Sequence, residues 1–180
     1  MTITRLSSDD FHEYVPELAA LLVDSVDGGH SLGFLAPFDV DAARSWWQSR
    51  YDAVAADALL VWVACESGQV VGTVSLVLNG VGPGGKANGR HRGDIVKLMV
   101  HRDARGQGLG RRLLAIAEDA AAEAGLTLLM LDTETGSVAE SLYDKAGWAC
   151  YGVVPDYAAD PAGVLQPCTF FYKQLAAAGR

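Results

Sequence analysis

Apolar residues recur along the chain in two rhythms, and the alternation between these rhythms outlines the secondary structure. Spacings of three and four residues predict helices over 11–26, 39–56, 108–124 and 137–145. Short runs rich in apolar and β-branched residues predict strands over 2–6, 59–65, 70–78, 94–100, 126–131, 148–154 and 169–175. This order predicts an α/β (α+β) protein with a mixed, twisted, seven-stranded sheet flanked by about four helices.

Some of these segments contain residues that depart from a simple pattern. Pro16 lies within the first helical stripe, which predicts a kink or a later start of that helix. Trp46 and Trp47 are adjacent and cannot both face one core, so one of them is expected to line a cleft or cover a loop. The run 126–131 is apolar except for Thr127, which is typical of a strand buried on both faces. The segment 155–167 is rich in turn-forming residues and predicts an irregular connection.

The stretch from Arg105 to Gly110 joins the strand predicted over 94–100 to the helix predicted over 108–124. Its glycines allow the backbone to approach a ligand closely. The first N–H groups of a helix have no helical acceptor and carry partial positive charge, and Arg105 and Arg111 add permanent charge on either side. The pattern predicts phosphate binding. The alternative is a solvent-facing turn in which glycine only permits tight geometry.

A second glycine-rich stretch, 80–86, has the spacing of two phosphate-binding patterns but lacks their context. Lys86 is followed by Ala87 instead of the Ser or Thr of a P-loop, and no helical pattern follows, so we interpret 80–93 as a mobile loop. The four histidines and three cysteines show no metal-ligand spacing, so no metal site is predicted. Cys65, Cys150 and Cys168 are expected to be buried free thiols.

The chain has 180 residues, which suits a single domain over 1–180 with a substantial core. Its formal net charge of −8 argues against a nucleic-acid partner, because phosphate neutralisation needs a basic surface. No apolar run is long enough to span a bilayer and the N-terminus lacks a signal-peptide pattern, so we expect a cytoplasmic protein with no membrane partner. The sequence leaves open whether the chain is a monomer or a homodimer.

Two signatures in order resemble those of the GNAT N-acetyltransferases. The strand 96–100 followed by Arg105-x-x-Gly108-x-Gly110 is similar to that family's acetyl-CoA-binding signature. The later stretch 139–148 is similar to its second signature, a tyrosine-bearing helix followed by a Gly-aromatic strand start. The resemblance covers essentially the whole chain. It implies the GNAT acyl-CoA N-acyltransferase fold, with acetyl-CoA as co-substrate and no metal.

The resemblance assigns the contacts with CoA to two adjacent segments. In GNAT enzymes the backbone of the strand that matches Leu98, Met99 and Val100 pairs with the pantetheine arm. The N–H groups of the following turn, together with an arginine, hold the pyrophosphate. The matching residues are Arg105, Gly106, Gln107, Gly108, Leu109, Gly110 and Arg111.

The resemblance also assigns the proton transfers. The family's tyrosine protonates the departing CoA thiolate, and Tyr143 is the matching residue, since a phenol stays protonated at neutral pH. A carboxylate or a water chain takes the proton from the substrate ammonium, because only the neutral amine is a nucleophile. Asp94 and Asp132 are candidates for this base, and the alternative for both is helix or strand capping or a surface ion pair. Glu134 is a third carboxylate, better placed to bind the ammonium.

A narrower resemblance links the chain to the tabtoxin-resistance acetyltransferase, which acetylates the amino group of a toxic β-lactam amino acid. It is carried by the stretches 26–34, 131–140 and 155–157. His30 and Tyr157 lie in two of these stretches and are expected, with Glu134, to contact the acceptor.

Taken together, these patterns predict an acetyl-CoA-dependent N-acetyltransferase that acts on the primary amine of a small molecule by direct transfer in a ternary complex. An amino-acid-like toxin or antibiotic is one acceptor class that the narrower resemblance implies. Two alternatives remain from the sequence. One is acetylation of a protein or peptide N-terminus, and the other is a CoA-binding sensor without catalytic activity.

Overall fold

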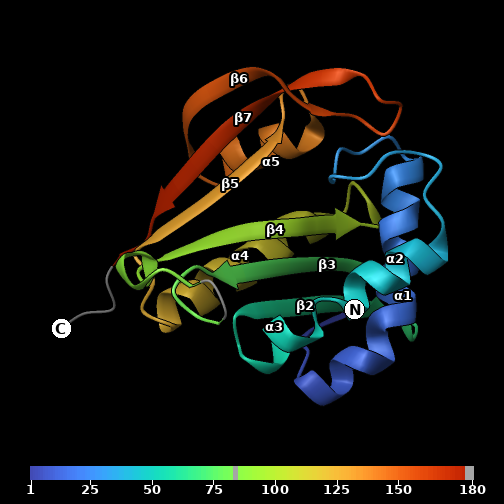
Figure 1. The fold of residues 1–180 in the computed structure, drawn as a ribbon, viewed down its shortest axis with the longest axis horizontal. Coiled ribbons are helices and arrows are strands. Elements are labelled where there is room, and N and C mark those ends of the chain that lie inside the picture. The colour runs from blue at the N-terminus through green and yellow to red at the C-terminus, as the bar shows by residue number, and fades with distance from the viewer. Residues whose placement is uncertain (83–84, 177–180) are drawn as a thin grey trace.

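In the computed structural model, which describes residues 1–82 and 85–176, a seven-stranded sheet has the order β1-β2-β3-β4-β5-β7-β6 (Figure 1). The strands are β1 (Thr2–Arg5), β2 (Leu59–Glu66), β3 (Gln69–Leu78), β4 (Arg92–Val100), β5 (Leu128–Glu134), β6 (Ala149–Ala159) and β7 (Leu165–Gln174). The helices are α1 (Ser8–Asp27), α2 (Val40–Gln48), α3 (Tyr51–Ala55), α4 (Leu109–Glu123) and α5 (Val138–Lys145), with 3₁₀ turns η1 (Ala87–Gly89) and η2 (Arg102–Ala104). Strands β4 and β5 pair in parallel and the other neighbours pair antiparallel, so the predicted mixed sheet is confirmed.

Helices cover the two halves of the sheet differently. Helix α1 packs on β3 and β4 and buries an apolar stripe between Phe11 and Val26, while α4 packs on the same strands from the opposite face. Helix α5 contacts β5 on the side of α4. In Figure 1 the helices α1, α2 and α3 lie over β2 to β4, so the corresponding face of β5, β7 and β6 has no helix over it among the described residues.

The first helix begins where its cap dictates, and the second predicted helix is interrupted. Ser7 and Asp10 form a capping box, so α1 starts at Ser8, and the later start predicted from Pro16 is wrong. The helix predicted over 39–56 is two helices, α2 and α3. The hydroxyl of Ser49 donates to the carbonyl of Trp46 at 2.7 Å and competes with the backbone for this acceptor, which favours the break.

The second half of the sheet is more exposed and more regular than predicted. Strand β5 buries Leu129 and Leu131 on one face but leaves Leu128 and Met130 only half-buried on the other, so the prediction that 126–131 is buried on both faces is wrong. The cause is the missing helix layer on that face. The irregular connection predicted over 155–167 is also wrong, because β6 extends to Ala159 and β7 begins at Leu165. The turn-forming residues instead make a bulge within β6, where the register shifts between Val154 and Ala158.

Further expectations concern single residues and short segments. Cys168 is buried and Cys65 is partly buried, but Cys150 is exposed on β6, so the prediction of three buried thiols is wrong for it. An edge strand without a helix over it leaves this thiol in water. Residues 83–84 of the predicted mobile loop lie outside the described residues. Within 1–82 and 85–176, no helix is long and apolar enough to cross a membrane, and no group of three His, Cys, Asp or Glu could hold a metal ion.

Candidate active site

A wedge opens in the middle of the sheet, between 95–100 of β4 and 131–134 of β5. The two strands are paired only from Arg92 opposite Leu128 to Asp94 opposite Met130. Beyond this point they diverge, as Figure 1 shows. The backbone of 95–100 therefore has no strand partner on its β5 side among the described residues, which leaves main-chain polar groups for a ligand, apart from the Val100 carbonyl that Arg105 engages.

A β-bulge marks the middle of this free edge. Lys97 and Leu98 of β4 stand opposite the single residue Val74 of β3, and Lys97 has a φ of 52°. Such bulges redirect a side chain. The Lys97 ammonium donates to the carbonyl of Leu32 at 2.9 Å, on the loop between α1 and α2. Burial lowers the pKa of Lys97, and the charge of Asp132 opposes this effect.

The turn that follows β4 is an open cradle of backbone N–H groups. Gly106 and Gly108 have φ values of 76° and 75°, which glycine adopts without strain, and Gly108 is the N-cap of α4. A Cβ atom at either position would meet no atom within 4 Å, so the space above the turn is open. No hydrogen bond among the described residues uses the N–H groups of 106–111. This geometry suits an anion such as a phosphate.

The two arginines of the turn have different surroundings. Arg105 folds back, so that its Nε donates to the carbonyl of Val100 at 3.0 Å and its guanidinium lies 3.7 Å from Asp24 of α1. Arg105 therefore braces the turn against β4 and α1. Arg111 is exposed on the first turn of α4 and has no ion-pair partner among the residues described, so its charge is available to a ligand.

Among the other residues predicted to contact the cofactor, Met99 and Leu109 can do so only through their backbone groups. The side chains of Met99 and Leu109 are buried in the two apolar cores. Leu98 and Val100 are half-buried beside them. The free polar groups of this strand and turn are thus main-chain groups, which fits recognition of an extended, amide-containing chain and a phosphate.

Tyr143 is held in a fixed orientation by the packing of its ring. Its ring centroid lies 6.0 Å from those of Trp148 and Phe171. Helix α5, which carries Tyr143, is anchored by Glu140. This carboxylate accepts hydrogen bonds of 2.6 Å from the N–H of Gly136 and from the hydroxyl of Thr169 on β7. Burial and the charge of Asp132 raise the pKa of Tyr143 above its ordinary value, so the phenol remains protonated.

The two aspartates predicted as bases lie on one face of the sheet. Asp94 is opposite Met130, and Asp132 follows two residues later on β5 with the same orientation. Asp94 accepts a hydrogen bond of 3.0 Å from the side chain of Asn79. Water reaches Asp132, but protein atoms surround it closely enough that burial raises its pKa; Lys97 opposes this and Asp94 adds to it. Glu134 lies one repeat further on the same strand face.

Two loops meet, one after α1 and one after β6. The loop 28–39 touches the β6–β7 loop, where the N–H of Ala36 donates to Pro161 at 2.8 Å. Tyr157 is exposed on β6 with its ring 4.9 Å from that of Phe170. His30 lies at the other end of its loop, where burial and Arg105 lower its pKa and Asp24 opposes them. The structure therefore places Tyr157 on the carboxylate side and His30 beside the turn braced by Arg105.

Comparison with known proteins decides the family. A family model described as the acetyltransferase (GNAT) family matches residues 30–148, which include the wedge, the glycine turn and Tyr143. The chain belongs to the GNAT acetyltransferase family. Members of this family use acetyl-CoA, and the seven-stranded mixed sheet is the GNAT acyltransferase fold.

The individual relatives share only modest sequence identity with this chain. An IAA acetyltransferase of Azospirillum brasilense is 36% identical over 104 residues, which are 57% of this chain and 63% of that protein, so the match spans less than two thirds of the relative's length. A ribosomal-protein-alanine N-acetyltransferase from Brucella melitensis is 27% identical, with a TM-score of 0.73 over 97% of this chain and all of that one (100%). The yncA protein of Salmonella typhimurium, whose structure holds its cofactor acetyl-CoA, has a TM-score of 0.74 at 21% identity and covers 100% of this chain and 96% of its own.

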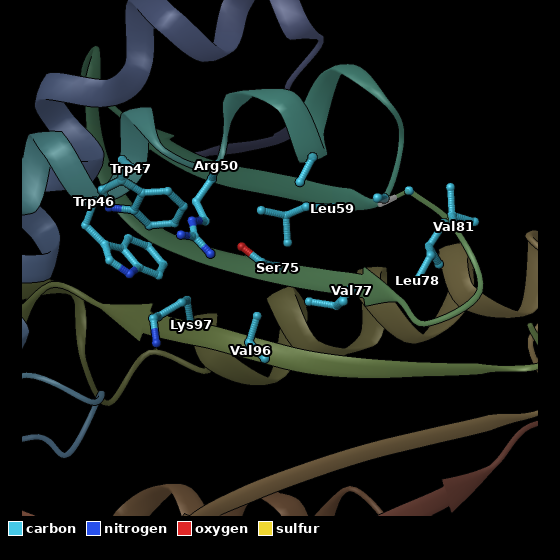
Figure 2. Close-up of a pocket in the computed structure, with 13 residues that line it drawn as sticks. Trp46, Trp47, Arg50, Leu59, Ser75, Val77, Leu78, Val81, Val96 and Lys97 are labelled. Atoms are coloured by element: carbon cyan, nitrogen blue, oxygen red, sulfur yellow. The ribbon is translucent and has the colours of Figure 1, made fainter. Parts of the chain in front are cut away.

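The structure adds residues that the sequence analysis did not assign to the site. Arg50, Ser75 and Lys97 line a cavity of about 380 Å³ between α2, α3 and the sheet (Figure 2). Both tryptophans border the cavity, but Trp47 is fully buried in the core whereas Trp46 is half-buried, so one packs in the core and the other lines a cleft, as predicted. The sequence marked Lys97 in one way, as the single charged residue within an apolar strand. Nothing in the sequence around Arg50 or Ser75 pointed to the cavity.

Proposed function

We propose that this protein transfers the acetyl group of acetyl-CoA to the primary amine of a small molecule, by direct transfer in a ternary complex. One observation carries the proposal: the free edge of β4 leads directly into the cradle of N–H groups at 106–111, and Tyr143 and two carboxylates flank the same wedge. The wedge can thus admit a cofactor arm from the side of the turn and an amine from the side of the carboxylates.

The residues present fit acetyl-CoA, which supplies the activated acetyl thioester. The N–H groups of 106–111 and the charge of Arg111 would hold its pyrophosphate at the N-terminus of α4. The main chain of 98–100 would pair with the amides of the pantetheine arm, as an added strand pairs with a sheet edge. Arg105 supports both segments from behind through Val100 and Asp24.

The proton transfers follow from the surroundings of the ionisable groups. Tyr143 donates its hydroxyl proton to the sulfur as the carbon–sulfur bond breaks, and its raised pKa keeps that proton in place until then. A carboxylate removes a proton from the amine as the carbon–nitrogen bond forms. Asp132 is the better candidate because its raised pKa makes it a stronger base, whereas Asp94 is engaged by Asn79. Glu134 is placed to attract the ammonium.

Binding and turnover test the proposal separately. Calorimetric titration with acetyl-CoA is expected to show one site per chain, and acceptor-dependent release of CoA thiol is expected with small primary amines. Absence of binding at millimolar acetyl-CoA would exclude the function. Binding without thiol release from any amine would instead indicate a CoA-binding sensor.

The finer acceptor class follows from the resemblance to the tabtoxin-resistance acetyltransferase. Parts of the stretches that carry it, 26–34, 131–140 and 155–157, lie at the wedge: residues 131–134 border it, Leu32 accepts a hydrogen bond from Lys97, and Tyr157 packs on Phe170, which pairs with Asp132. This placement supports an amino-acid-like toxin or antibiotic as acceptor. A β-lactam amino acid belongs in the amine panel, and protection of bacteria that express the protein is the expected outcome.

A second candidate function is acetylation of a protein or peptide N-terminus. The observation that favours it is the full-length match to the Brucella melitensis ribosomal-protein-alanine N-acetyltransferase. Short peptides that begin with alanine distinguish the two functions, since they become the preferred substrates only if this candidate is correct.

A further inference from the structure

The cavity beside the wedge has a charged end and an apolar end. It lies between α2, α3 and the strands β2 to β4, and its charged end is formed by Trp46, Arg50 and Lys97. Leu59, Val77 and Leu78 form the other end (Figure 2). Val77, which lines the cavity, pairs with Asp94 in the antiparallel register, so the cavity and the wedge carboxylates share one face of the sheet. Its volume of about 380 Å³ lies within the range of small-molecule sites.

Neither of the two cations at the charged end forms an ion pair within the part of the chain that the structure describes, although Asp132 is near enough to Lys97 to oppose the lowering of its pKa. The guanidinium of Arg50 bonds the adjacent Ser49 hydroxyl and lies 5.2 Å from the ring of Trp46. The ammonium of Lys97 lies 5.0 Å from the same ring and donates to a backbone carbonyl. The chain has 22 acidic residues against 14 basic ones, so acidic partners are abundant. The cavity is a local positive region in an acidic protein, which favours an anionic ligand.

A hydroxyl group in the same cavity also has no partner. The Oγ of Ser75 is buried and makes no hydrogen bond to any described residue, although buried polar groups are nearly always bonded. Its neighbour on the strand, Thr73, donates to the carbonyl of Trp62 at 2.7 Å. Figure 2 shows the Ser75 oxygen directed toward the charged end, near the Arg50 guanidinium. An oxygen atom of a ligand at that end would satisfy this hydroxyl.

We propose that the cavity binds the acceptor of the acetyl transfer, and that this acceptor is an amine that also carries a carboxylate and an apolar side chain. The carboxylate lies between Arg50 and Lys97 and accepts a hydrogen bond from Ser75. The apolar side chain extends toward Val77 and Leu78. The amino group, attached close to the carboxylate, stays at the wedge where Asp132 can deprotonate it. This inference rests on the proposed acetyltransferase function and adds the chemical class of the substrate.

Matched pairs of amines isolate the carboxylate. Release of CoA thiol is measured with two amino acids, L-phenylalanine and L-leucine. It is also measured with two neutral analogues of phenylalanine, L-phenylalaninamide and 2-phenylethylamine, which keep the amine and the side chain but lack the carboxylate. The acids are expected to exceed the neutral analogues in kcat/KM by about 10- to 100-fold, the effect of a charged hydrogen-bonding partner. Arg50→Gln is expected to remove this preference. Arg50 is exposed, so the substitution leaves the core intact.

Arg44→Gln is the matched control, because Arg44 is an exposed arginine of α2 that pairs with Asp41. It is expected to keep the preference for acids. Equal turnover of acids and neutral analogues by the wild-type protein would overturn the substrate class and leave the acetyltransferase function standing. An unchanged preference in Arg50→Gln would overturn the assignment of the cavity.

A binding measurement separates this inference from the proposed function. Calorimetric titration with L-phenylalanine is carried out on the protein saturated with CoA, and needs no turnover. Binding that weakens in Arg50→Gln and not in Arg44→Gln supports the cavity even if no thiol is released. If millimolar L-phenylalanine does not bind and the protein turns over neutral amines, the inference about the cavity is overturned. It is also overturned if L-phenylalanine does not bind and no amine is turned over.

Discussion

Tyr143→Phe removes one oxygen atom from a ring that is otherwise packed into the core. If Tyr143 donates the proton to the leaving thiolate, kcat is expected to fall by about 10²- to 10⁴-fold, the usual contribution of a general acid. Stability should change by less than about 1 kcal/mol, because the hydroxyl has no hydrogen-bond partner among the residues described. Tyr143→Ala, by contrast, loses the contacts with Trp148 and Phe171 and is expected to cost about 3–5 kcal/mol.

Three measurements on the phenylalanine variant separate chemistry from folding. Steady-state release of CoA thiol gives kcat, calorimetry gives the Kd for acetyl-CoA, and thermal unfolding gives Tm. We expect kcat alone to change. Tyr14→Phe on α1 is the control, since Tyr14 packs on the other core, away from the wedge, and should leave all three unchanged.

The outcome that would refute the assignment is a kcat equal to that of the wild-type protein. A parallel loss of kcat, acetyl-CoA affinity and Tm would show instead that the hydroxyl is structural. The pH profile adds a check. Because the pKa of Tyr143 is raised, its proton is retained as pH increases, so kcat should not decline on the alkaline side below the ordinary pKa of tyrosine, about 10.

Two further predictions concern the cradle and the base. Gly108→Ala places a side chain at a φ of 75°, which costs about 1–2 kcal/mol of folding stability, and it should also weaken acetyl-CoA binding measured by calorimetry. Gly125→Ala is the control, because Gly125 has a φ of 79° beyond the other end of α4. It should cost the same stability and leave the affinity for acetyl-CoA unchanged. Asp132→Asn should raise Tm at pH 7 and lower kcat/KM. Burial raises the pKa of Asp132, so its ionised form destabilises the folded protein above that pKa. The gain in Tm should therefore vanish in acid, where the wild-type carboxyl is protonated. An unchanged affinity in the first variant, or a lower Tm at pH 7 in the second, would contradict these assignments.

The sequence determined the features that depend on short stretches of chain. The capping box of Ser7 and Asp10 fixed the start of α1. The glycines at 106 and 108 required a turn with positive φ before α4, and that turn is present. The position of Tyr143 on a helix and the order of strands and helices could also be predicted from short stretches of sequence. Hydrophobic periodicity and turn chemistry act over a few residues, so they can be interpreted without the fold.

Tertiary structure decided how these parts make a site. The divergence of β4 from β5 depends on pairing that stops at Asp94, and no local pattern marks that point. Arg105 looked like a free phosphate ligand until its bonds to Val100 and Asp24 were known. The cavity brings Lys97, whose ammonium bonds the carbonyl of Leu32 65 residues away in the sequence, together with Ser75 and with residues of α2 and α3. Sequence patterns report which face of an element is apolar, but only packing between distant segments fixes where a charge remains unpaired and a cavity remains open.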